Sequence, residues 1–381
     1  MINVCCGTGS TGRICTDIAD MLIEQGHECK IAYGRGSVPE KYQNISVKIG
    51  STFGVYCNAL KARLFDNEGL NAKHATKKFI KWVKTYDPDV IHLHNLHGYY
   101  LNLEILFDYL KTCGKKIVWT LHDCWAFTGH CSYFDYPHCD RWKTGCSGCI
   151  RLHDYPKSFT DRSKRNFDKK KQLFTGISNL TIVTPSEWLA DLVKQSFLKE
   201  YPVEVINNGI DLSIFKPTPS DFRERHGLHD QKIILGVAFV WDKRKGFDDF
   251  IKLAGVIDDG YRIVMVGVNK KQKKHLPKNI IGIERTNNIK ELAEIYTAAD
   301  VFFNPTYEDN YPTVNLEAQA CGTPVVTYAT GGSVESVPEA NVVAVGEIPT
   351  NFKNMSLERK NMQSTSAVAE KYLMVCYGDI K

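Results

Sequence analysis

The feature that most constrains the fold is a regular alternation between short apolar runs and segments with helical spacing. Runs such as Asp89–His94, Lys116–Leu121 and Leu180–Thr184 have the length and composition of buried strands. Between such runs lie helical segments: Ile14–Gln25 repeats apolar residues at helical intervals and is closed by Gly26. Because parallel strands are joined by helical crossovers, the alternation predicts an α/β fold with doubly wound parallel sheets.

A second series of the same kind follows a turn-rich stretch at 207–219. A chain of 381 residues has room for two domains of ordinary size. The sequence therefore predicts two Rossmann-like domains, residues 1–212 and 213–365, which face each other across a cleft. The final helical segment, within 366–381, is expected to pack back on the first domain. In the second domain we expect strands at 232–240, 261–266, 301–304 and 324–328 and helices at 247–257, 289–299 and 313–321.

The charge balance excludes some kinds of partner. The chain has 48 basic and 43 acidic residues, a net charge of +5, which is too small for a dedicated nucleic-acid-binding protein. It is compatible with an anionic small substrate or an anionic membrane surface. The longest apolar run, Ile233–Trp241, is too short to span a membrane, and the first residues do not resemble a secretory signal. We therefore expect a cytoplasmic protein, whose thirteen cysteines do not form a disulfide framework.

Two clusters of basic residues stand out, at 164–171 and at 270–278. We interpret both as solvated helix and loop surface, which is the usual role of such clusters. The alternative is peripheral contact with an anionic membrane that carries a lipid-linked substrate.

A glycine-rich turn, Gly7-Thr-Gly-Ser-Thr-Gly12, joins the first expected strand to the first expected helix. Glycines let the backbone approach a ligand and the helix start favours an anion, so Gly9, Ser10 and Gly12 are candidate ligand-binding residues. A dinucleotide site also needs an acidic residue about 20 residues further on, and the next strand ends at Arg35 instead. Because arginine suits a 2′-phosphate, an NADP-dependent oxidoreductase is an alternative function, as is a close-packed turn without a ligand.

The most informative stretch is residues 304–326, where an expected strand, an acidic loop and a helix follow one another. The helix start at Pro312 and Thr313 offers free backbone N–H groups, which suit a phosphate or a sugar hydroxyl. Asp309 in the loop and Glu317 in the helix can accept hydrogen bonds from vicinal hydroxyl groups, such as those of a ribose. The stretch therefore predicts a site for a nucleotide or a sugar.

The same stretch resembles the signature of retaining glycosyltransferases of family 4, which have two related α/β domains around a nucleotide-sugar cleft, the GT-B fold. That signature is two glutamates separated by seven residues and followed by Cys-Gly-Thr-Pro-Val-Val, which stands here at 321–326. Glu317 matches the second glutamate, and Asp309 occupies the first position, for which Glu308 is the other candidate. The resemblance implies that Glu317 binds the nucleotide ribose and that Asp309 meets the donor sugar.

The resemblance covers nearly the whole chain. Pro185–Glu187 is similar to the family's Pro-Ser-Glu turn, and 205–217 is similar to its hinge segment. Lys245, before Gly246, matches the lysine of a basic loop that holds the diphosphate, and Arg244 is a substitute for an arginine that the family carries several residues earlier. Two cations are needed because the β-phosphate leaves with developing negative charge, and with them no metal is required there.

His122 follows an expected strand, at a place where the family has a histidine close to the donor sugar and the acceptor. The resemblance therefore implies a catalytic role for His122, with Asp123 as its partner; the alternative is a structural histidine. His92 and His94 share one face of a strand and are expected to line the cleft.

Region 124–153 is interpreted as a cysteine-rich insertion of a subgroup of this family. It carries the pattern C-x7-C-x6-C-x2-C, whose last part is a zinc-knuckle spacing, in a loop with little apolar sequence of its own. A structural zinc bound by four thiolates would order such a loop, and simple reduced thiols are the other interpretation. The four residues are Cys131, Cys139, Cys146 and Cys149.

The resemblance implies an enzyme that transfers a hexosyl unit from a UDP- or GDP-sugar to a glycan or lipid-linked acceptor. The pathway class would be surface polysaccharide biosynthesis, as in capsule or lipopolysaccharide, in the cytoplasm or at the inner face of the cell membrane. No NAD and no nucleic acid are expected as partners. A catalytically weak carbohydrate-binding protein of the same fold is a second alternative, beside the oxidoreductase.

Overall fold

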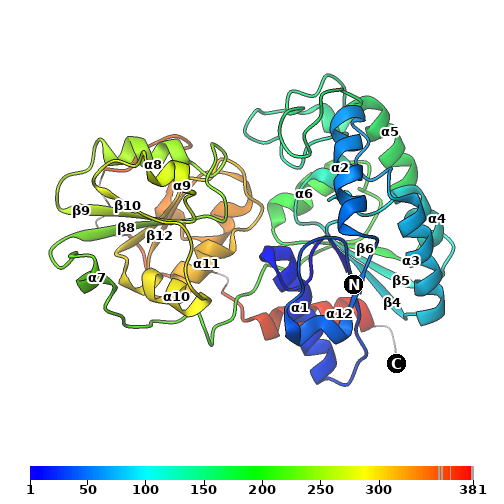
Figure 1. Cartoon of the computed structure of the whole chain (residues 1–381), viewed down its shortest axis with the longest axis horizontal. Helices are drawn as coiled ribbons and strands as arrows, with labels where there is room; N and C mark the ends of the chain where they lie inside the picture. Colours follow the sequence, from blue (N-terminus) through cyan, green and yellow to red (C-terminus); the bar gives the residue numbers. More distant parts are fainter. Residues whose placement is uncertain (351, 353–354, 361, 379–381) are drawn as a thin grey trace. The chain divides into compact units, whose positions relative to one another are not determined.

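A computed structural model describes residues 1–350, 352, 355–360 and 362–378. The chain divides into two compact units, which are coloured by sequence in Figure 1. Unit 1 comprises Met1–Asn207 and Thr365–Lys381, and unit 2 comprises Asn208–Ser364. Within the described ranges, every helix is too short or too polar to cross a membrane.

Unit 1 contains a seven-stranded parallel sheet with the order β3-β2-β1-β4-β5-β6-β7. The strands are β1 (Ile2–Asn3), β2 (Ile31–Tyr33), β3 (Ser46–Lys48), β4 (Val90–Leu93), β5 (Lys116–Thr120), β6 (Leu180–Thr184) and β7 (Val203–Val205). The helices are α1 (Gly9–Glu24), α2 (Thr52–Phe65), α3 (Lys73–Tyr86), α4 (Leu103–Leu110), α5 (Ser163–Phe174), α6 (Glu187–Gln195) and α12 (Thr365–Tyr377).

Alternation along the central strands of unit 1 builds an apolar core on each face of the sheet. On β5, Trp119 packs with Phe107 of α4 and Phe174 of α5 on one face, because successive side chains of a strand point to opposite faces. Its neighbour Val118 packs on the other face with Ile18 of α1. Both faces are therefore covered, which is why these strands are apolar throughout.

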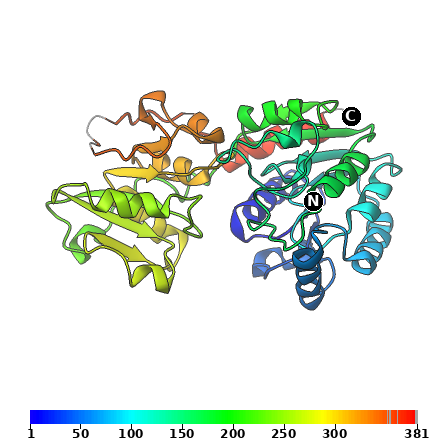
Figure 2. The same cartoon turned by 90° about the horizontal axis from the view of Figure 1, so that it is seen from above.

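The last helix packs on the first unit, as predicted. Helix α12 contacts α1, and Tyr372 of α12 is buried with Ile18 and Val118. The hydroxyl of Tyr372 also lies 3.2 Å from Oγ1 of Thr120, at the end of β5. Helix α12, the red helix in Figure 2, thus completes the core of unit 1.

Unit 2 contains a six-stranded parallel sheet with the order β10-β9-β8-β11-β12-β13. The strands are β8 (Lys232–Val237), β9 (Tyr261–Val266), β10 (Ile280–Ile283), β11 (Val301–Asn304), β12 (Val325–Tyr328) and β13 (Val342–Val343). The helices are α7 (Phe222–Arg225), α8 (Phe247–Ala254), α9 (Lys270–Lys273), α10 (Ile289–Ala298) and α11 (Thr313–Ala320).

The core of unit 2 follows the same period of two. Phe302 of β11 packs on the face covered by α10 and α11, whereas Phe303 packs on the face covered by α8. The prediction of two doubly wound parallel sheets is therefore confirmed. The predicted strand 232–240 is too long, because β8 ends at Val237 and the chain turns away, leaving Phe239 96% exposed.

Candidate active site

In unit 2 the candidate residues lie where the order of the strands reverses. Within the sheet, β8 has two neighbours: β9, which follows it in the sequence, lies on one side of it, and β11 lies on the other side. Such a switch point is where open α/β sheets bind ligands, outside the carboxyl ends of the strands. The loop after β8 carries Arg244 and Lys245, and the loop after β11 carries Asp309; the backbone N–H of Tyr307 joins the two loops by donating to the carbonyl of Arg244 at 2.8 Å.

Lys245 and Asp309 are in direct contact. The Nζ of Lys245 donates to a carboxylate oxygen of Asp309, and the two side chains are 20% and 14% exposed. Burial lowers the pKa of Lys245; the carboxylate of Asp309 opposes that shift and the charge of Arg244 adds to it. The backbone N–H of Lys245 also donates to Oδ1 of Asp242, at 2.9 Å, which holds the backbone of the basic loop at this residue.

Arg244 is attached to the acidic loop from the other side. Its Nη1 donates to the carbonyl oxygen of Glu308 at 3.0 Å, and its charge acts on Lys245. Glu308 itself is buried, with 1% of its surface exposed, whereas Asp309 is the acidic residue of this loop whose carboxylate reaches Lys245. The structure thus brings the two predicted cations and the predicted acidic loop together.

Helix α11 carries the second predicted acidic residue. Pro312 precedes the first residue of the helix, Thr313, and Glu317 lies one turn further on. One carboxylate oxygen of Glu317 accepts a 3.0 Å hydrogen bond from the hydroxyl of Tyr296 on α10, in the interior of the unit. Tyr296 fixes this carboxylate, and its role could not be anticipated because it lies on another helix.

A buried polar network connects the start of α11 to its neighbours. Asn315 accepts from Asn304 at 2.8 Å and donates to the hydroxyls of Ser333 and Ser336 in the short helix η4 (Gly331–Ser336). The backbone N–H of Gly332 donates to the carbonyl of Asp309 at 3.1 Å. The network holds the acidic loop and α11 in one arrangement, and the sequence signal that could have indicated it is the alternation of polar and apolar residues along this buried helix.

In unit 1 the glycine-rich turn forms the start of α1. Gly7 and Gly9 both have φ of +68°, and a side chain on Gly12 would meet the backbone N of Gly7 at 3.3 Å. Gly12 therefore serves close packing. A Cβ on Gly9 would meet no atom within 4 Å, and Ser10 is exposed, so these two candidates lie at an accessible helix start.

Three histidines lie close together on β4 and β5: His92 within β4, His94 directly after it and His122 two residues after β5. Nδ1 of His94 lies 3.0 Å from Nε2 of His122, and Nε2 of His92 lies 2.8 Å from Oγ1 of Thr120. Burial lowers the pKa of His122 to about 4, against a smaller opposing effect of Asp123. Burial also lowers the pKa values of His92 and His94 far below 6.5, so this cluster is neutral near pH 7.

Asp123, the predicted partner of His122, acts on it through its charge and is hydrogen-bonded to a further histidine, His97. Its carboxylate is hydrogen-bonded to Nε2 of His97 at 2.8 Å and accepts from the backbone N–H of Trp125 at 2.9 Å. Burial raises the pKa of Asp123, but His97, the Trp125 N–H and His122 together outweigh this effect, and the net shift is downward. Nδ1 of His97 lies 2.9 Å from the hydroxyl of Tyr155, so His97 links this acid to the segment that follows the cysteine-rich region.

A buried carboxylate of unit 1 was missed in the sequence. Oε1 of Glu68 accepts from the backbone N–H groups of Gly98 and Tyr99, at 2.7 and 2.9 Å, and thereby fixes the loop after β4. The ring of Tyr99 lies under the guanidinium of Arg35, at 5.9 Å. No local pattern marks Glu68, because its partners are 30 and 31 residues away.

The cysteine-rich loop is ordered by aromatic packing. Phe127, Phe134 and Trp142 form a buried ring cluster, which contradicts the expectation that the loop lacks an apolar core. Lys170, from a predicted surface cluster, is buried instead: its Nζ donates to the carbonyls of Trp125 and Thr128, and burial lowers its pKa to about 7.

The predicted four-cysteine zinc site is not formed in the described part of the chain. No three or more His, Cys, Asp or Glu side chains are arranged there to hold a metal ion. Cys131 and Cys149 share a thiol hydrogen bond, and Cys146 accepts from the backbone N–H of Gly129 at 3.2 Å, whereas Cys139 packs beside the apolar core.

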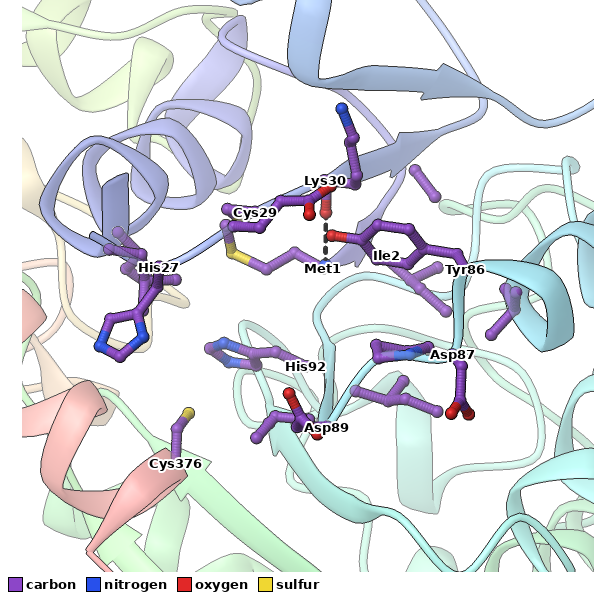
Figure 3. Close-up of a pocket in the computed structure, with 18 of the residues that line it drawn as sticks. Met1, Ile2, His27, Cys29, Lys30, Tyr86, Asp87, Asp89, His92 and Cys376 are labelled. Carbon is purple, nitrogen blue, oxygen red and sulfur yellow. Dashed lines mark hydrogen bonds between the residues drawn. The ribbon is translucent and has the colours of Figure 1, made fainter. Parts of the chain in front are cut away.

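A cavity of about 330 Å³ lies at the opposite edge of the sheet in unit 1 (Figure 3). It is bordered by Cys29 and Lys30, just before β2, by Asp89, just before β4, and by His92 within β4. In Figure 3 the amino group of Met1 donates to the carbonyl of Lys30, at 2.7 Å. His92 belongs both to the lining of this cavity and to the histidine cluster, whereas His122 and the glycine-rich turn do not border the cavity.

Two family models match the chain. The model for glycosyltransferase family 4 matches residues 11–214, and the model for glycosyl transferases group 1 matches residues 220–358. The Escherichia coli (strain K12) protein WcaC, named as a colanic acid biosynthesis glycosyl transferase, is 26% identical over 363 residues, which are 91% of this chain and 86% of that protein. The processive diacylglycerol alpha-glucosyltransferase of Acholeplasma laidlawii is 31% identical over 172 residues, 42% of this chain and 51% of its own.

Solved structures share the fold. Sucrose-phosphate synthase from Thermosynechococcus elongatus has a TM-score of 0.69 at 16% identity, covering 98% of this chain and 96% of its own. Anabaena HepE in complex with UDP-glucose has a TM-score of 0.59 at 14% identity, covering 97% and 93%. These matches leave no support for the oxidoreductase alternative. With a family model that spans more than half of its length, this chain belongs to glycosyltransferase family 4 and is a sugar-transferring enzyme with the GT-B fold.

Proposed function

We propose that the enzyme transfers a hexosyl unit, with retention at the anomeric carbon, from a UDP- or GDP-sugar held by unit 2. The observation that carries this proposal is the convergence of Arg244, Lys245 and Asp309 at the strand switch point of unit 2. Two adjacent cations suit a diphosphate, whose charge grows as the sugar departs. The acidic loop beside them suits the hydroxyls of the sugar that the diphosphate carries.

The nucleotide would lie along α11. Glu317, whose carboxylate is oriented by Tyr296, would accept hydrogen bonds from the ribose hydroxyls. The backbone N–H groups of the helix start, at Thr313 after Pro312, would bind a phosphate oxygen. Asp309 rather than Glu308 would meet the donor sugar, because Glu308 is buried and Asp309 reaches Lys245.

Unit 1 would hold the acceptor. Gly9, Ser10 and Gly12 lie at the start of α1, where Gly9 has open space around it and backbone N–H groups can meet sugar hydroxyls or phosphate. His122 would contact the reacting sugars as a neutral imidazole, since its pKa of about 4 keeps it uncharged near pH 7. Asp123 would act through His97.

The proposed reaction needs no nucleophile from the protein. The bond between the anomeric carbon and the β-phosphate oxygen breaks, and the acceptor oxygen forms the new bond on the same face. The acceptor proton passes to the departing phosphate, whose charge Lys245 and Arg244 stabilise. We further propose a glycan or lipid-linked acceptor of surface polysaccharide biosynthesis, on the cytoplasmic side of the membrane, because the relative WcaC is named for colanic acid biosynthesis.

Thermal unfolding in the presence of UDP, GDP, ADP and NADP tests the donor site directly. Ligand binding stabilises the folded enzyme in proportion to the logarithm of ligand concentration over Kd. We expect stabilisation by UDP or GDP that is lost in Glu317→Ala and kept in Glu339→Ala, a matched change at an exposed glutamate of unit 2. Stabilisation by NADP alone, or UDP and GDP shifts that survive Glu317→Ala, would overturn the proposal.

A further inference from the structure

Two thiols of the cysteine-rich loop are in direct contact, although they lie near opposite ends of the loop in the sequence. Cys131 and Cys149 share a thiol hydrogen bond. Sugar transfer as proposed above uses neither thiol. Because the two sulfur atoms are already neighbours, a small movement of the loop would bring them to the distance of an S–S bond, about 2.05 Å. The pair is therefore placed for covalent chemistry.

The two thiols differ in their access to solvent. Cys131 is 7% exposed and packs in the core of unit 1. Cys149 is partly exposed, and its neighbours Gly148 and Ile150 are exposed. A small oxidant in solution therefore reaches the sulfur of Cys149 first, and Cys131 can react only with an oxidised Cys149 at its side. Such an exposed cysteine beside a second one is the arrangement of an attacking and a resolving thiol.

The surroundings of Cys149 favour the thiolate, which is the form of a thiol that attacks peroxides. The thiol of Cys131 and the backbone N–H of Arg151 both donate to its sulfur and lower the pKa of Cys149. The charge of His130 acts in the same direction, whereas burial and the carboxylate of Asp161 oppose it. The contacts of Cys149 thus support a negative charge on its sulfur.

His130 is itself held by a buried carboxylate. Its Nδ1 lies 2.6 Å from Oδ1 of Asp66 at the end of α2, and the two side chains are 1% and 3% exposed. Burial lowers the pKa of His130, but the carboxylate of Asp66 and a charge on Cys149 together outweigh burial, and the net shift is upward. Nε2 of His130 is buried and has no hydrogen-bond partner among the described residues. An imidazole with one nitrogen on a carboxylate and the other unused is suited to take the proton that the thiol gives up.

The turn that carries Cys149 is fixed by contacts on both sides. The guanidinium of Arg141 donates to the carbonyl of Ser147, at 2.5 Å, and to the carbonyl of Gly148. Gly148 has a φ of +57°, and a Cβ on it would lie 2.9 Å from Nη1 of Arg141. The backbone N–H of Cys149 donates to Oδ2 of Asp161 at 2.6 Å. These contacts keep the sulfur of Cys149 next to its partner thiol.

We propose that Cys149 and Cys131 are a peroxide-reactive pair, which oxidation joins by a reversible disulfide. The thiolate sulfur of Cys149 attacks one oxygen of hydrogen peroxide, and the O–O bond breaks. Cys149 becomes a sulfenic acid, and the second oxygen leaves as hydroxide, which the proton released by the thiol converts to water.

The second step closes the bridge. The sulfur of Cys131 attacks the sulfur of Cys149, an S–S bond forms, and the S–O bond breaks. The hydroxyl group leaves with the proton of Cys131 as water. Two thiols are oxidised in total and one peroxide is reduced to two water molecules, and a dithiol restores both thiols by exchange.

The bridge would close the cysteine-rich loop beside the proposed acceptor half-site. Tyr155, in the segment that follows the loop, contacts His97, and His97 is hydrogen-bonded to Asp123. Oxidation would therefore restrain the segments on both sides of this pair. This consequence rests on the proposed function, whereas the oxidation chemistry does not.

Hydrogen peroxide, added to the reduced full chain in a buffer with EDTA, tests the proposal. The remaining thiols are alkylated, and the chain is digested with trypsin, which cuts after Arg141 and Lys143 and so separates Cys131 from Cys149. By mass spectrometry we expect two peptides joined through these cysteines and released by dithiothreitol. Cys149 should be oxidised about tenfold or more faster than Cys57, a partly exposed cysteine of α2. The bridge should raise the Tm by about 3 °C or more, because it restricts the unfolded chain.

Three variants assign the roles of the two thiols. Cys149→Ser should form no bridge, and Cys131→Ser should stop the reaction at the sulfenic acid of Cys149, which dimedone traps. Cys57→Ser is the matched control and should form the bridge like the parent chain. Thermal unfolding of the reduced proteins shows that each variant is folded, and the measurement on the parent chain depends on none of them.

A parent chain that forms no bridge with peroxide would overturn the proposal. So would a bridge between Cys146 and Cys149, the C-x2-C pair, or oxidation of Cys57 at the same rate as Cys149. Failure of the proposed function is seen separately, as the absence of UDP or GDP stabilisation in a chain that still forms the bridge between Cys131 and Cys149.

Discussion

The ammonium group of Lys245 and the carboxylate of Asp309 form an ion pair across 64 residues of sequence. Each side chain follows a different strand of unit 2, β8 and β11, which are neighbours in the sheet. Burial lowers the pKa of Lys245 and the carboxylate of Asp309 opposes that shift, so the ion pair favours a charged lysine at this site. A diphosphate would take the place of solvent beside this cation.

Replacing Lys245 by methionine should lower kcat/KM for sugar transfer by about a hundredfold or more, since the departing phosphate loses a charge-assisted partner. Lys245→Arg should recover part of the activity because it keeps the charge. Steady-state kinetics with the donor found by thermal unfolding provides the measurement. Lys243→Met is the matched control at an exposed neighbour and should be close to the parent enzyme; equal losses in both variants would contradict the role of Lys245.

Removing the hydroxyl that orients Glu317 should weaken donor binding. In Tyr296→Phe the carboxylate loses a buried 3.0 Å hydrogen bond, and we expect a three- to tenfold rise in Kd for the nucleotide, about the value of one hydrogen bond. Isothermal titration with UDP or GDP measures this. Tyr261→Phe, at the start of β9, is the control for loss of a tyrosine hydroxyl elsewhere in unit 2. An equal rise in Kd in this variant would contradict the specific role of Tyr296 in orienting Glu317.

Gly246 should not tolerate a side chain. Its φ is +72°, and a Cβ would lie 2.3 Å from the carbonyl oxygen of Pro305. Gly246→Ala should therefore lower the free energy of unfolding by about 2 kcal/mol or more and displace Lys245 beside it. Gly255→Ala, at φ of −82°, should change it by less than about 1 kcal/mol in the same urea titration. Similar values for the two variants would refute the strain argument.

Acidification should destabilise unit 1 through its buried histidines. The pKa values of His92 and His94 lie well below 6.5 in the folded state, so unfolding binds protons as the pH falls below about 6.5. Stability is thus full above that pH and decreases on acidification, by about 1.4 kcal/mol per pH unit for each such histidine. Urea titrations at pH 7, 6 and 5 should show this slope.

His92→Gln should reduce the slope by about one proton, whereas His74→Gln, at an exposed histidine of α3, should leave it unchanged. A slope that is the same in all three proteins would show that the buried histidines are not responsible.

The cysteine-rich loop should depend on its aromatic cluster. Trp142→Ala removes a ring that is 2% exposed and stacked with Phe134, and should cost about 3–5 kcal/mol. Tyr136→Ala, in the same loop but 40% exposed, should cost less than about 1 kcal/mol.

EDTA should leave the Tm of the enzyme unchanged. One equivalent of zinc per chain by elemental analysis, with a lower Tm after chelation, would contradict this account and restore the zinc interpretation.

Local pattern was sufficient for the fold class. The alternation of apolar runs and helical spacing identified both parallel sheets, since strand period and helix period are properties of neighbouring residues. It also identified the apolar face of α12, whose packing on α1 is confirmed. The same reasoning placed the end of β8 three residues too late, because Phe239 and Val240 are apolar but exposed, and only the turn of the chain decides that.

The sequence by itself determined the alternating architecture, the family, and the positions of the acidic loop, the basic loop and the histidines. All of these depend on the spacing of neighbouring residues or on short motifs. Tertiary structure alone decided which of these groups meet: Lys245 with Asp309, Glu317 with Tyr296, and Asp123 with His97. It also brought Phe127, Phe134 and Trp142 of the cysteine-rich loop into one buried cluster. Such contacts join residues far apart in the chain, and their energies depend on burial and distance, which no local pattern contains.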